Sequence, residues 1–150
     1  MTQVKRKYYK NGQISSELWF FDGVLHRTDG PAAIFYYEDG SIMEVLYFYF
    51  GKLHRSNGPA FISYFEDGSI HCEKYLLYGK PHRLDGPAVV EYYPNGNPCI
   101  EVFYRNGILF RKDGPIRVDY KENGSLRQSV YFINHKRLHS CKSVQVRRFS

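Results

Sequence analysis

Cysteine is scarce in this 150-residue chain, which has only Cys72, Cys99 and Cys141. The number is odd, and no two of them have the close spacing of a zinc knuckle or of a small disulfide framework. Cys72 and Cys99 occupy adjacent positions of the repeat described below, so in a strand they would point to opposite faces. We therefore expect reduced thiols in an intracellular setting.

Long hydrophobic runs are also missing. The longest, Val45–Phe50, is far too short to span a bilayer. The first ten residues, MTQVKRKYYK, lack the apolar segment of a secretory signal. No segment shows the apolar spacing of an amphipathic helix. We therefore expect a soluble protein without helices.

Acidic residues are absent from both ends of the chain. The basic residues there are Lys5, Arg6, Lys7 and Lys10, and then Lys136, Arg137, Lys142, Arg147 and Arg148. The ends thus carry +9 and the body −3, which together give the net charge of +6. Such ends could contact the phosphates of lipid or nucleic acid. The alternative is that charge protects the open edges of a sheet from unwanted pairing.

What the chain does contain is a repeat. The segment GKLHRSNGPA at 51–60 recurs with small changes at 23–32, 79–88 and 107–116. An Asn/Asp-Gly step keeps the same period of 28 residues, with its glycines at Gly12, Gly40, Gly68, Gly96 and Gly124. A fixed period of this length is typical of a repeat array. We expect one domain over 1–150, with regular repeats from about 8 to 135 and an eroded C-terminal cap at 136–150.

Each repeat predicts a β-hairpin. In the unit 59–86, Pro59–Phe65 forms a first strand, Asp67-Gly68 a tight turn, and a second strand runs from about Ile70 to Leu77. A connection of about nine residues leads to the next proline. The chain is therefore predicted to be all-β, a single-layer twisted antiparallel meander of about ten strands. A coil with one turn per repeat is the alternative.

The turn and the strand after it resemble MORN-type repeats. The residues that carry the resemblance are Tyr36–Gly40, Tyr92–Gly96 and Glu101–Gly107. The pattern is similar to the YwqK-type variant of bacterial antitoxin proteins, but it has an inserted His-Arg-x-Asp-Gly-Pro-Ala segment. This longer form resembles repeats of Marseillevirus-type giant viruses, and the likeness extends over about residues 8–146. It implies single-layer hairpin sheets that act in scaffolding, protein contact or phospholipid contact, and generally not in catalysis.

The inserted segment is the motif most suggestive of a site. Its residues are His26, Arg27, Asp29, Gly30, Pro31; His54, Arg55, Asn57, Gly58, Pro59; His82, Arg83, Asp85, Gly86, Pro87; and Arg111, Asp113, Gly114, Pro115. Equivalent positions lie two strands apart, about 9–10 Å, whereas the ligands of one zinc ion lie about 2 Å from it. One metal ion therefore cannot bridge two repeats, and Phe110 replaces the histidine in the fourth.

Two interpretations of this motif remain. In the first, the Asp or Asn side chain accepts backbone N–H groups two residues on, as in an Asx turn, and the histidine or arginine bonds the same loop. In the second, the row of arginines contacts an anionic surface. The neighbouring carboxylates would cancel most of that field, which favours the first.

Other candidate sites are weaker. The acidic column Glu17, Glu73 and Glu101 is expected to pair with Lys or Arg across strands, because its members lie too far apart for a catalytic pair. The aromatic columns could stack nucleic-acid bases, but the acidic body favours core packing. No motif supports catalysis or a cofactor.

The sequence therefore predicts a non-enzymatic repeat protein that acts by protein–protein interaction or as a scaffold. A homodimer through a sheet edge is a reasonable partner hypothesis. The giant-virus resemblance adds the virion, or the host cytoplasm or nucleus, as a location. The alternatives are a peripheral binder of anionic lipid or nucleic acid through the basic ends, and an antitoxin-like binder.

Overall fold

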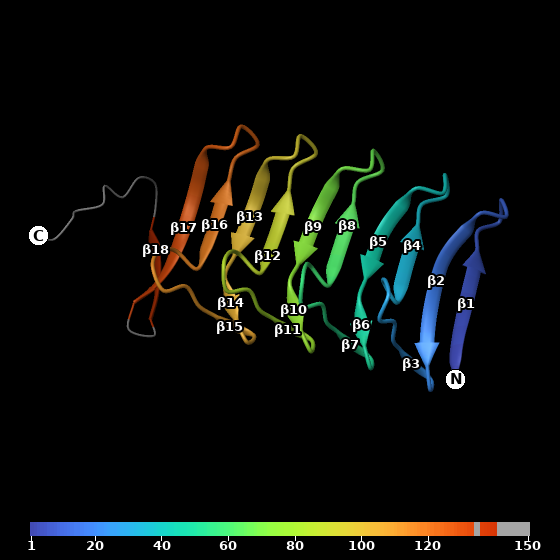
Figure 1. Ribbon diagram of the computed structural model, residues 1–150. Coiled ribbons are helices and arrows are strands. Elements are labelled where there is room, and N and C mark those ends of the chain that lie inside the picture. The colour runs from blue at the N-terminus through green and yellow to red at the C-terminus, as the bar shows by residue number, and fades with distance from the viewer. Residues whose placement is uncertain (134–135, 141–150) are drawn as a thin grey trace, which may run out of the picture.

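The computed structural model describes residues 1–133 and 136–140 of the chain. Within these residues every regular element is a strand and there is no helix. The strands form an antiparallel meander of hairpins in one large sheet, so the predicted fold class is confirmed (Figure 1).

The main sheet runs in chain order from one terminus to the other. Its path consists of β1 (Thr2–Tyr8), β2 (Ile14–Phe21), β4 (Ala33–Tyr36), β5 (Ile42–Leu46), β8 (Phe61–Tyr64), β9 (Ile70–Lys74), β12 (Val89–Tyr92), β13 (Pro98–Val102), β16 (Arg117–Tyr120), β17 (Leu126–Ile133) and β18 (Lys136–Ser140). Each strand pairs antiparallel with the next, so neighbouring repeats are joined by the same ladder that joins the two strands of one repeat.

The second strand of a repeat is shorter than the sequence predicted. In the unit 59–86 it ends at Lys74, and the backbone N–H of Tyr75 then donates to the carbonyl of Ala88 at 2.8 Å. The chain continues into a small hairpin of its own, formed by β10 (Leu76–Leu77) and β11 (Lys80–Pro81). The connection after the second strand is thus a folded element, which strand propensities did not indicate.

Every full repeat has such a small hairpin. The others are β6 (Phe48–Tyr49) with β7 (Lys52–Leu53), and β14 (Tyr104–Arg105) with β15 (Ile108–Leu109). In the first repeat, β3 (Val24–Leu25) pairs with the unbroken end of β2. The small hairpins form a row along one long edge of the sheet, opposite the tips of the main hairpins (Figure 1).

The tips of the main hairpins have the same geometry in each repeat. At the second tip, the backbone N–H of Gly40 donates to Tyr37 and that of Tyr37 to Ser41, while Gly40 has a φ of 88°. A type I turn followed by a glycine of positive φ forms this kind of bulged connection. The register shifts by one residue beside each tip, for example between Phe35 and Tyr36. The Asn/Asp-Gly step of the sequence therefore fixes the turn and its bulge.

The most deeply buried side chains follow the Gly-Pro steps. Ala32, Ala60 and Ala88, each directly after such a step, are completely buried, and Ile116 in the fourth repeat is nearly so. In the main sheet Ser63 and Cys72 are directly paired and both are buried.

The eroded C-terminal cap was predicted at 136–150. Residues 136–140 form β18, which pairs with β17. The rest of the predicted cap, 141–150, lies outside the described residues.

Candidate functional site

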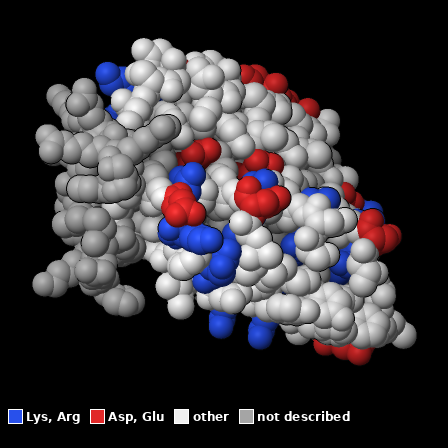
Figure 2. Space-filling model, turned by 60° about the vertical axis from the view of Figure 1, so that its left-hand side comes forward, with Lys and Arg blue, Asp and Glu red and all other residues white. Residues whose placement is uncertain are grey.

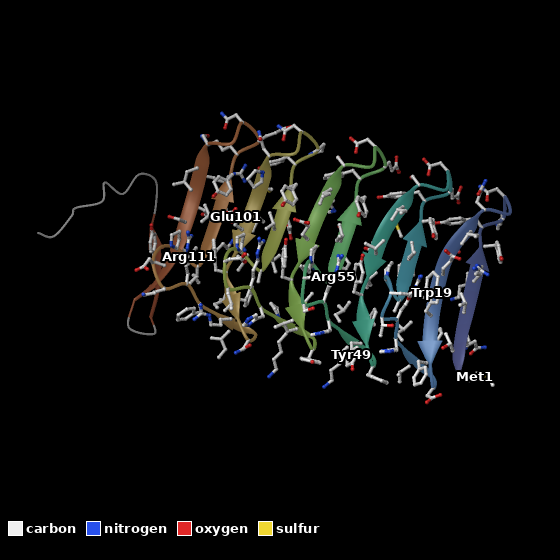
Figure 3. All side chains as sticks on the ribbon, viewed as in Figure 1. Met1, Trp19, Tyr49, Arg55, Glu101 and Arg111 are labelled. Carbon is white, nitrogen blue, oxygen red and sulfur yellow. The ribbon has the colours of Figure 1, made fainter. Side chains whose placement is uncertain are left out.

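The arginine of each loop lies on an aromatic ring of its own repeat. The guanidinium carbon is 4.4 Å from the ring centroid for Arg27 on Trp19 and 3.9 Å for Arg55 on Tyr47. The pairs in the third and fourth repeats are Arg83 with Tyr75 at 4.0 Å and Arg111 with Phe103 at 3.9 Å. A guanidinium over an aromatic face is attracted by the ring quadrupole. The arginine row is thus packed against aromatic rings of the array. Figure 3 labels two of its members, Arg55 and Arg111.

The glycine of the Gly-Pro step leaves room for this guanidinium. A Cβ at Gly58 would lie 3.2 Å from the guanidinium carbon of Arg55, and at Gly86 the distance to Arg83 would be 3.1 Å. The guanidinium also bonds the loop backbone, because Nη1 of Arg55 donates to the carbonyl of Pro59 at 3.3 Å. The same bond recurs in all four repeats. Aromatic ring, arginine and glycine therefore form one layered unit.

Two of the four loops add a carboxylate. Nε of Arg27 donates to Asp29 at 2.8 Å, and Nε of Arg83 donates to Asp85 at 3.0 Å. These bonds hold the pKa of both aspartates below the usual value. The Arg27 and Arg83 side chains are only 26% and 27% exposed, so most of each is covered. The loop aspartates thus contact arginine side chains.

Asx-type bonds, which we expected in these loops, are found at the hairpin tips instead. There the side chain of Asp39 accepts the backbone N–H of Ser41 at 2.8 Å, and Asp67 accepts that of Ser69 at the same distance. Bonds from the hydroxyls of the same serines, followed by these backbone bonds, lower the pKa of both carboxyls. The tip carboxylates therefore act in turn formation.

The second loop differs from the first and third. Asn57 stands where Asp29 and Asp85 stand, and an amide carries no charge. Within the described residues Arg55 has no carboxylate at ion-pair distance, although it keeps its ring, its glycine and its proline carbonyl. Arg55 is therefore a mostly immobilised cation whose charge the loop does not balance.

The histidines connect each loop to the next repeat. Nδ1 of His26 accepts the backbone N–H of Phe50 at 3.1 Å, and Nδ1 of His54 accepts that of Tyr78 at 3.3 Å. His82 does the same for Asn106 at 3.1 Å. In the first two cases the imidazole also stacks on the aromatic ring, with centroids 4.2 Å apart. The histidine column thus bonds the turn of the following small hairpin.

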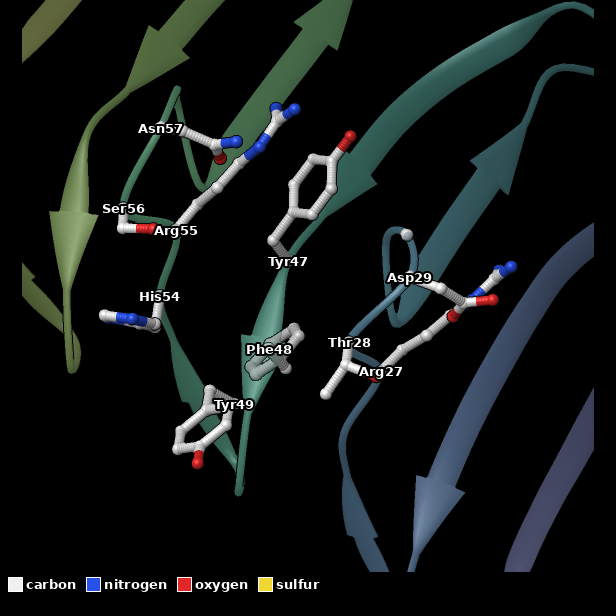
Figure 4. Close-up of a pocket in the computed structure, with 11 residues that line it drawn as sticks. Arg27, Thr28, Asp29, Tyr47, Phe48, Tyr49, His54, Arg55, Ser56 and Asn57 are labelled. Carbon is white, nitrogen blue, oxygen red and sulfur yellow. The ribbon is translucent and has the colours of Figure 1, made fainter.

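Grooves lie between successive loops. One, of about 460 Å³, has Arg27–Gly30 on one side, His54–Asn57 on the other and Tyr47 at its base. The next, of about 620 Å³, lies between Arg55–Gly58 and His82–Asp85. Figure 4 shows the first groove, with Asn57 and the ring of Tyr47 on either side of the Arg55 side chain. In Figure 2 acidic side chains lie directly beside basic ones on the visible face. Arg55 lines both grooves.

The acidic column pairs mainly with tyrosine. The hydroxyl groups of Tyr36, Tyr92 and Tyr120 donate to Glu17, Glu73 and Glu101 at 2.8, 2.9 and 2.9 Å. In the part of the chain that the structure describes, the predicted basic partner is found for Glu17 alone, which accepts Nε of Arg6 at 2.6 Å. Burial, and then the bond to glutamate, raises the pKa of Tyr36 and Tyr120 to about 12. Sequence reasoning missed these partners, although both columns repeat at the same period.

A second tyrosine column spans neighbouring repeats. The hydroxyl groups of Tyr9, Tyr37 and Tyr93 donate to backbone carbonyls 27 residues later, at 2.5, 2.8 and 3.0 Å. Phe65 occupies the equivalent position of the third tip and has no hydroxyl.

Two basic residues of the N-terminal strand contact other residues of the same chain. Arg6 bonds Glu17, which raises the pKa of the arginine, and the Lys5 amino group lies 5.1 Å from the centroid of Phe20. Of the other residues predicted to contact anions, Lys7 is exposed on β1, and the rest lie near the C-terminus. Of these C-terminal residues Lys136 and Arg137 lie in β18, and Lys142, Arg147 and Arg148 lie outside the described residues.

Other chemistry has little support in the described part of the chain. No group of three or more His, Cys, Asp or Glu side chains could hold a metal ion there. Cys72 and Cys99 are free thiols, and burial raises the pKa of Cys72 to about 11, which makes it a poor nucleophile at neutral pH. Among the same residues no helix is long and apolar enough to cross a membrane.

Comparison with known proteins identifies the repeat class. Residues 88–109 match the family described as MORN repeat variant. No curated protein and no solved structure is detectably similar to the chain. The matched segment covers the main hairpin β12–β13 and the small hairpin β14–β15, and the same arrangement recurs in neighbouring units at a spacing of 28 residues. This one segment is thus similar to a MORN repeat variant.

Proposed function

We propose that this protein is a non-enzymatic scaffold that binds other proteins through its repeat array. The observation that carries the proposal is the bonding between repeats. Loop histidines, tip tyrosines and the sheet ladder each connect one repeat to the next, so the array forms an extended surface with a fixed pitch. Repeat arrays of this kind commonly present such surfaces to partners.

The sheet edges are the proposed site of self-association. β1 pairs only with β2, and all seven of its residues are exposed. An edge strand has unpaired backbone N–H and C=O groups, so a second chain can add a strand to it. We propose that two copies associate through a sheet edge, and the C-terminal edge at β18 is the other candidate.

Light scattering coupled to size exclusion tests self-association. The full chain is run from low to high micromolar concentration, beside a variant with proline at Val4 in β1. A dimer that forms with concentration and is lost in Val4→Pro supports the N-terminal edge. A dimer that persists in Val4→Pro supports the other edge, and a monomer throughout contradicts self-association.

Co-purification from native material tests the broader proposal. Each protein that comes down with the chain is then purified and titrated directly against it. A partner with measurable affinity supports the scaffold role, and a set of contaminants that all fail direct titration contradicts it. The identity of that partner would also distinguish two more specific hypotheses, an antitoxin-like function and a role as a component of a giant-virus particle.

Anion binding by the ends is a second candidate, favoured by the exposed Lys7 and the basic composition of β1. Two of the four basic residues before Asn11 are already engaged, by Glu17 and Phe20, which weakens the case. Binding to anionic liposomes and to DNA at low and moderate salt is compared with a chain lacking residues 1–7 and 136–150. Affinity that survives this truncation rules out the mechanism.

A further inference from the structure

We propose that Arg55 binds a carboxylate side chain from an acidic segment of a protein partner, and that this segment lies in the two grooves on either side of Arg55. The inference rests on the proposed function, because it names the chemistry of the protein contact. It starts from the difference between the second loop and its two neighbours.

The neighbouring loops show the geometry of the missing interaction. In them the Nε of Arg27 and the Nε of Arg83 each donate to an aspartate of the same loop, at 2.8 and 3.0 Å. Arg55 has the same ring contact and the same proline carbonyl, so its guanidinium is held in the same way. Asn57 supplies no carboxylate. The donor is therefore oriented for a carboxylate that this loop does not provide.

Immobilisation makes Arg55 a better receptor than an ordinary surface arginine. A free arginine loses side-chain entropy when it pairs, which is one reason that exposed ion pairs contribute little. Here the ring of Tyr47 and the backbone at Gly58 already restrict the side chain. Charge-assisted bonds to a planar guanidinium are also the strong and directional ones. Little further ordering is needed for a carboxylate to bind.

The grooves give room for the residues on either side of that carboxylate. They measure about 460 and 620 Å³ and share Arg55, Ser56 and Asn57 as a common wall. Tyr49 on one side is 41% exposed and Leu84 on the other is 70% exposed, so each groove offers apolar contact. The segment that fits has an acidic residue flanked by apolar ones.

Charge favours a carboxylate over a phosphate. Asp29 lines the first groove and Asp85 the second, so negative charge lies on both sides of Arg55. A dianionic phosphate, or a polymer of phosphates, is repelled more strongly by these groups than a single carboxylate is. The net −3 of the body outside the basic ends acts in the same direction.

The test uses single substitutions that place the residue of one repeat at the equivalent position of another. Asn57→Asp fills the site with the carboxylate that loops one and three already have, and Asp85→Asn removes it from the third loop. Asn95→Asp is the control for net charge, because it lies at a hairpin tip where Asp39 and Asp67 are the native equivalents. Circular dichroism checks that all three fold.

The probe is a short labelled peptide with blocked termini and one glutamate flanked by leucine residues, and the same peptide with glutamine in place of glutamate is the uncharged control. Binding is measured by fluorescence anisotropy at low salt, and the NMR signal of the Arg55 Nε–H group reports the position. We expect wild type and Asn95→Asp to bind alike, with a shift of the Arg55 signal. Asn57→Asp should bind about threefold to tenfold more weakly, the range of one charge-assisted contact at a partly exposed site. Asp85→Asn should bind more tightly, because Arg83 becomes a second receptor.

Four outcomes overturn the inference: no binding of the glutamate peptide by wild type, equal binding by wild type and Asn57→Asp, equal binding of the glutamine peptide, or displacement of the glutamate peptide by inorganic phosphate at lower concentrations than by acetate. The last would assign the site to phosphate. Failure of the scaffold proposal looks different, because the glutamate peptide would still bind with the expected variant pattern while no purified partner did.

Discussion

At the scale of single residues, the repeated arginine has three contacts at once. It stacks on a ring of its own repeat, fills the space left by a glycine and bonds the carbonyl of the following proline. Exposed ion pairs alone would add little stability. Packing of the guanidinium on the ring and glycine explains why all four repeats keep the arginine while the aspartate varies.

The missing hydroxyl at Phe65 gives a prediction. Tyr37 donates to the carbonyl of Tyr64, 27 residues later, and a tyrosine at position 65 would reach the carbonyl of Tyr92 in the same way. Phe65→Tyr should therefore raise the free energy of unfolding by about 0.5–1.5 kcal/mol, the usual net value of such a bond. Urea denaturation measures it.

The matched control is Tyr37→Phe, which removes one existing bond and should lower the free energy of unfolding by a similar amount. If Tyr37→Phe is destabilising and Phe65→Tyr is neutral, the hydroxyl at 65 does not reach its acceptor, and the contact with the ring of His71 is the reason to examine.

Acidification should destabilise the protein through its paired carboxyls. Arginine bonds lower the pKa of Glu17, Asp29 and Asp85 in the folded state. The stability from these pairs is fully present above the unfolded pKa of about 4 and is lost as the pH falls through the lower folded pKa. Unfolding free energy measured from pH 6 to pH 3 should therefore fall.

The double variant Asp29→Asn/Asp85→Asn tests that cause. It removes two of the three carboxyls whose pKa is lowered by arginine, so its unfolding free energy should change less steeply with pH than that of wild type. Equal slopes for the two proteins would mean that the loop pairs do not contribute.

At the scale of the element, the small hairpin depends on the preceding repeat. Phe50 and Tyr78 occupy turn positions with φ of 45° and 50°, where large side chains are rare. Their ring contacts with His26 and His54 and the bonds to the imidazole Nδ1 atoms offset that cost. A histidine in one loop thus stabilises an unfavourable turn in the next.

His54→Ala removes both the bond and the ring contact at Tyr78. We expect a loss of about 1–2 kcal/mol in the free energy of unfolding, and faster hydrogen exchange at the Tyr78 amide than at the Phe50 amide. His71→Ala is the comparison, because His71 is exposed and lies at a strand rather than in a loop. A His71→Ala variant as destabilised as His54→Ala would remove the special role of the loop histidine.

At the scale of the whole molecule, each strand of the main sheet pairs only with its neighbours in the order, so distant repeats are not paired with one another within residues 1–133 and 136–140. Stability is then approximately a sum over repeats and the interfaces between them. The number of repeats can change without a change in the fold of each.

Deletion of one whole period tests this additivity. Removal of residues 59–86 joins Gly58 to Pro87 and preserves the Gly-Pro step, so the shorter chain should fold with the same circular dichroism spectrum. Its urea m-value should be lower by about a fifth, since m follows the surface buried. Removal of 73–86 deletes half a period and should abolish folding. A shorter chain that unfolds after loss of the full period would contradict additivity.

Much of the architecture could be predicted from the sequence, because the residues that specify each turn and strand lie close together in the chain and recur at a fixed period. Asp67-Gly68 specifies a tip, and alternating residues such as those of Phe61–Tyr64 specify a strand, within a few positions of one another. The interruption at Tyr75 could not be predicted in this way. At this point the backbone N–H of Tyr75 donates to the carbonyl of Ala88, thirteen residues later, a contact that strand propensity does not encode.

The repeated motif itself was visible in the sequence, and its separate contacts were not. The sequence alone determined that hairpins follow one another at 28 residues and that Arg55, unlike Arg27 and Arg83, has an asparagine two positions later. Only the tertiary structure decided that Arg55 stacks on Tyr47, that His54 bonds the next repeat, and that Glu73 pairs with tyrosine. The physical reason is that these contacts join residues from different strands, whose separation in space is set by packing of the folded sheet.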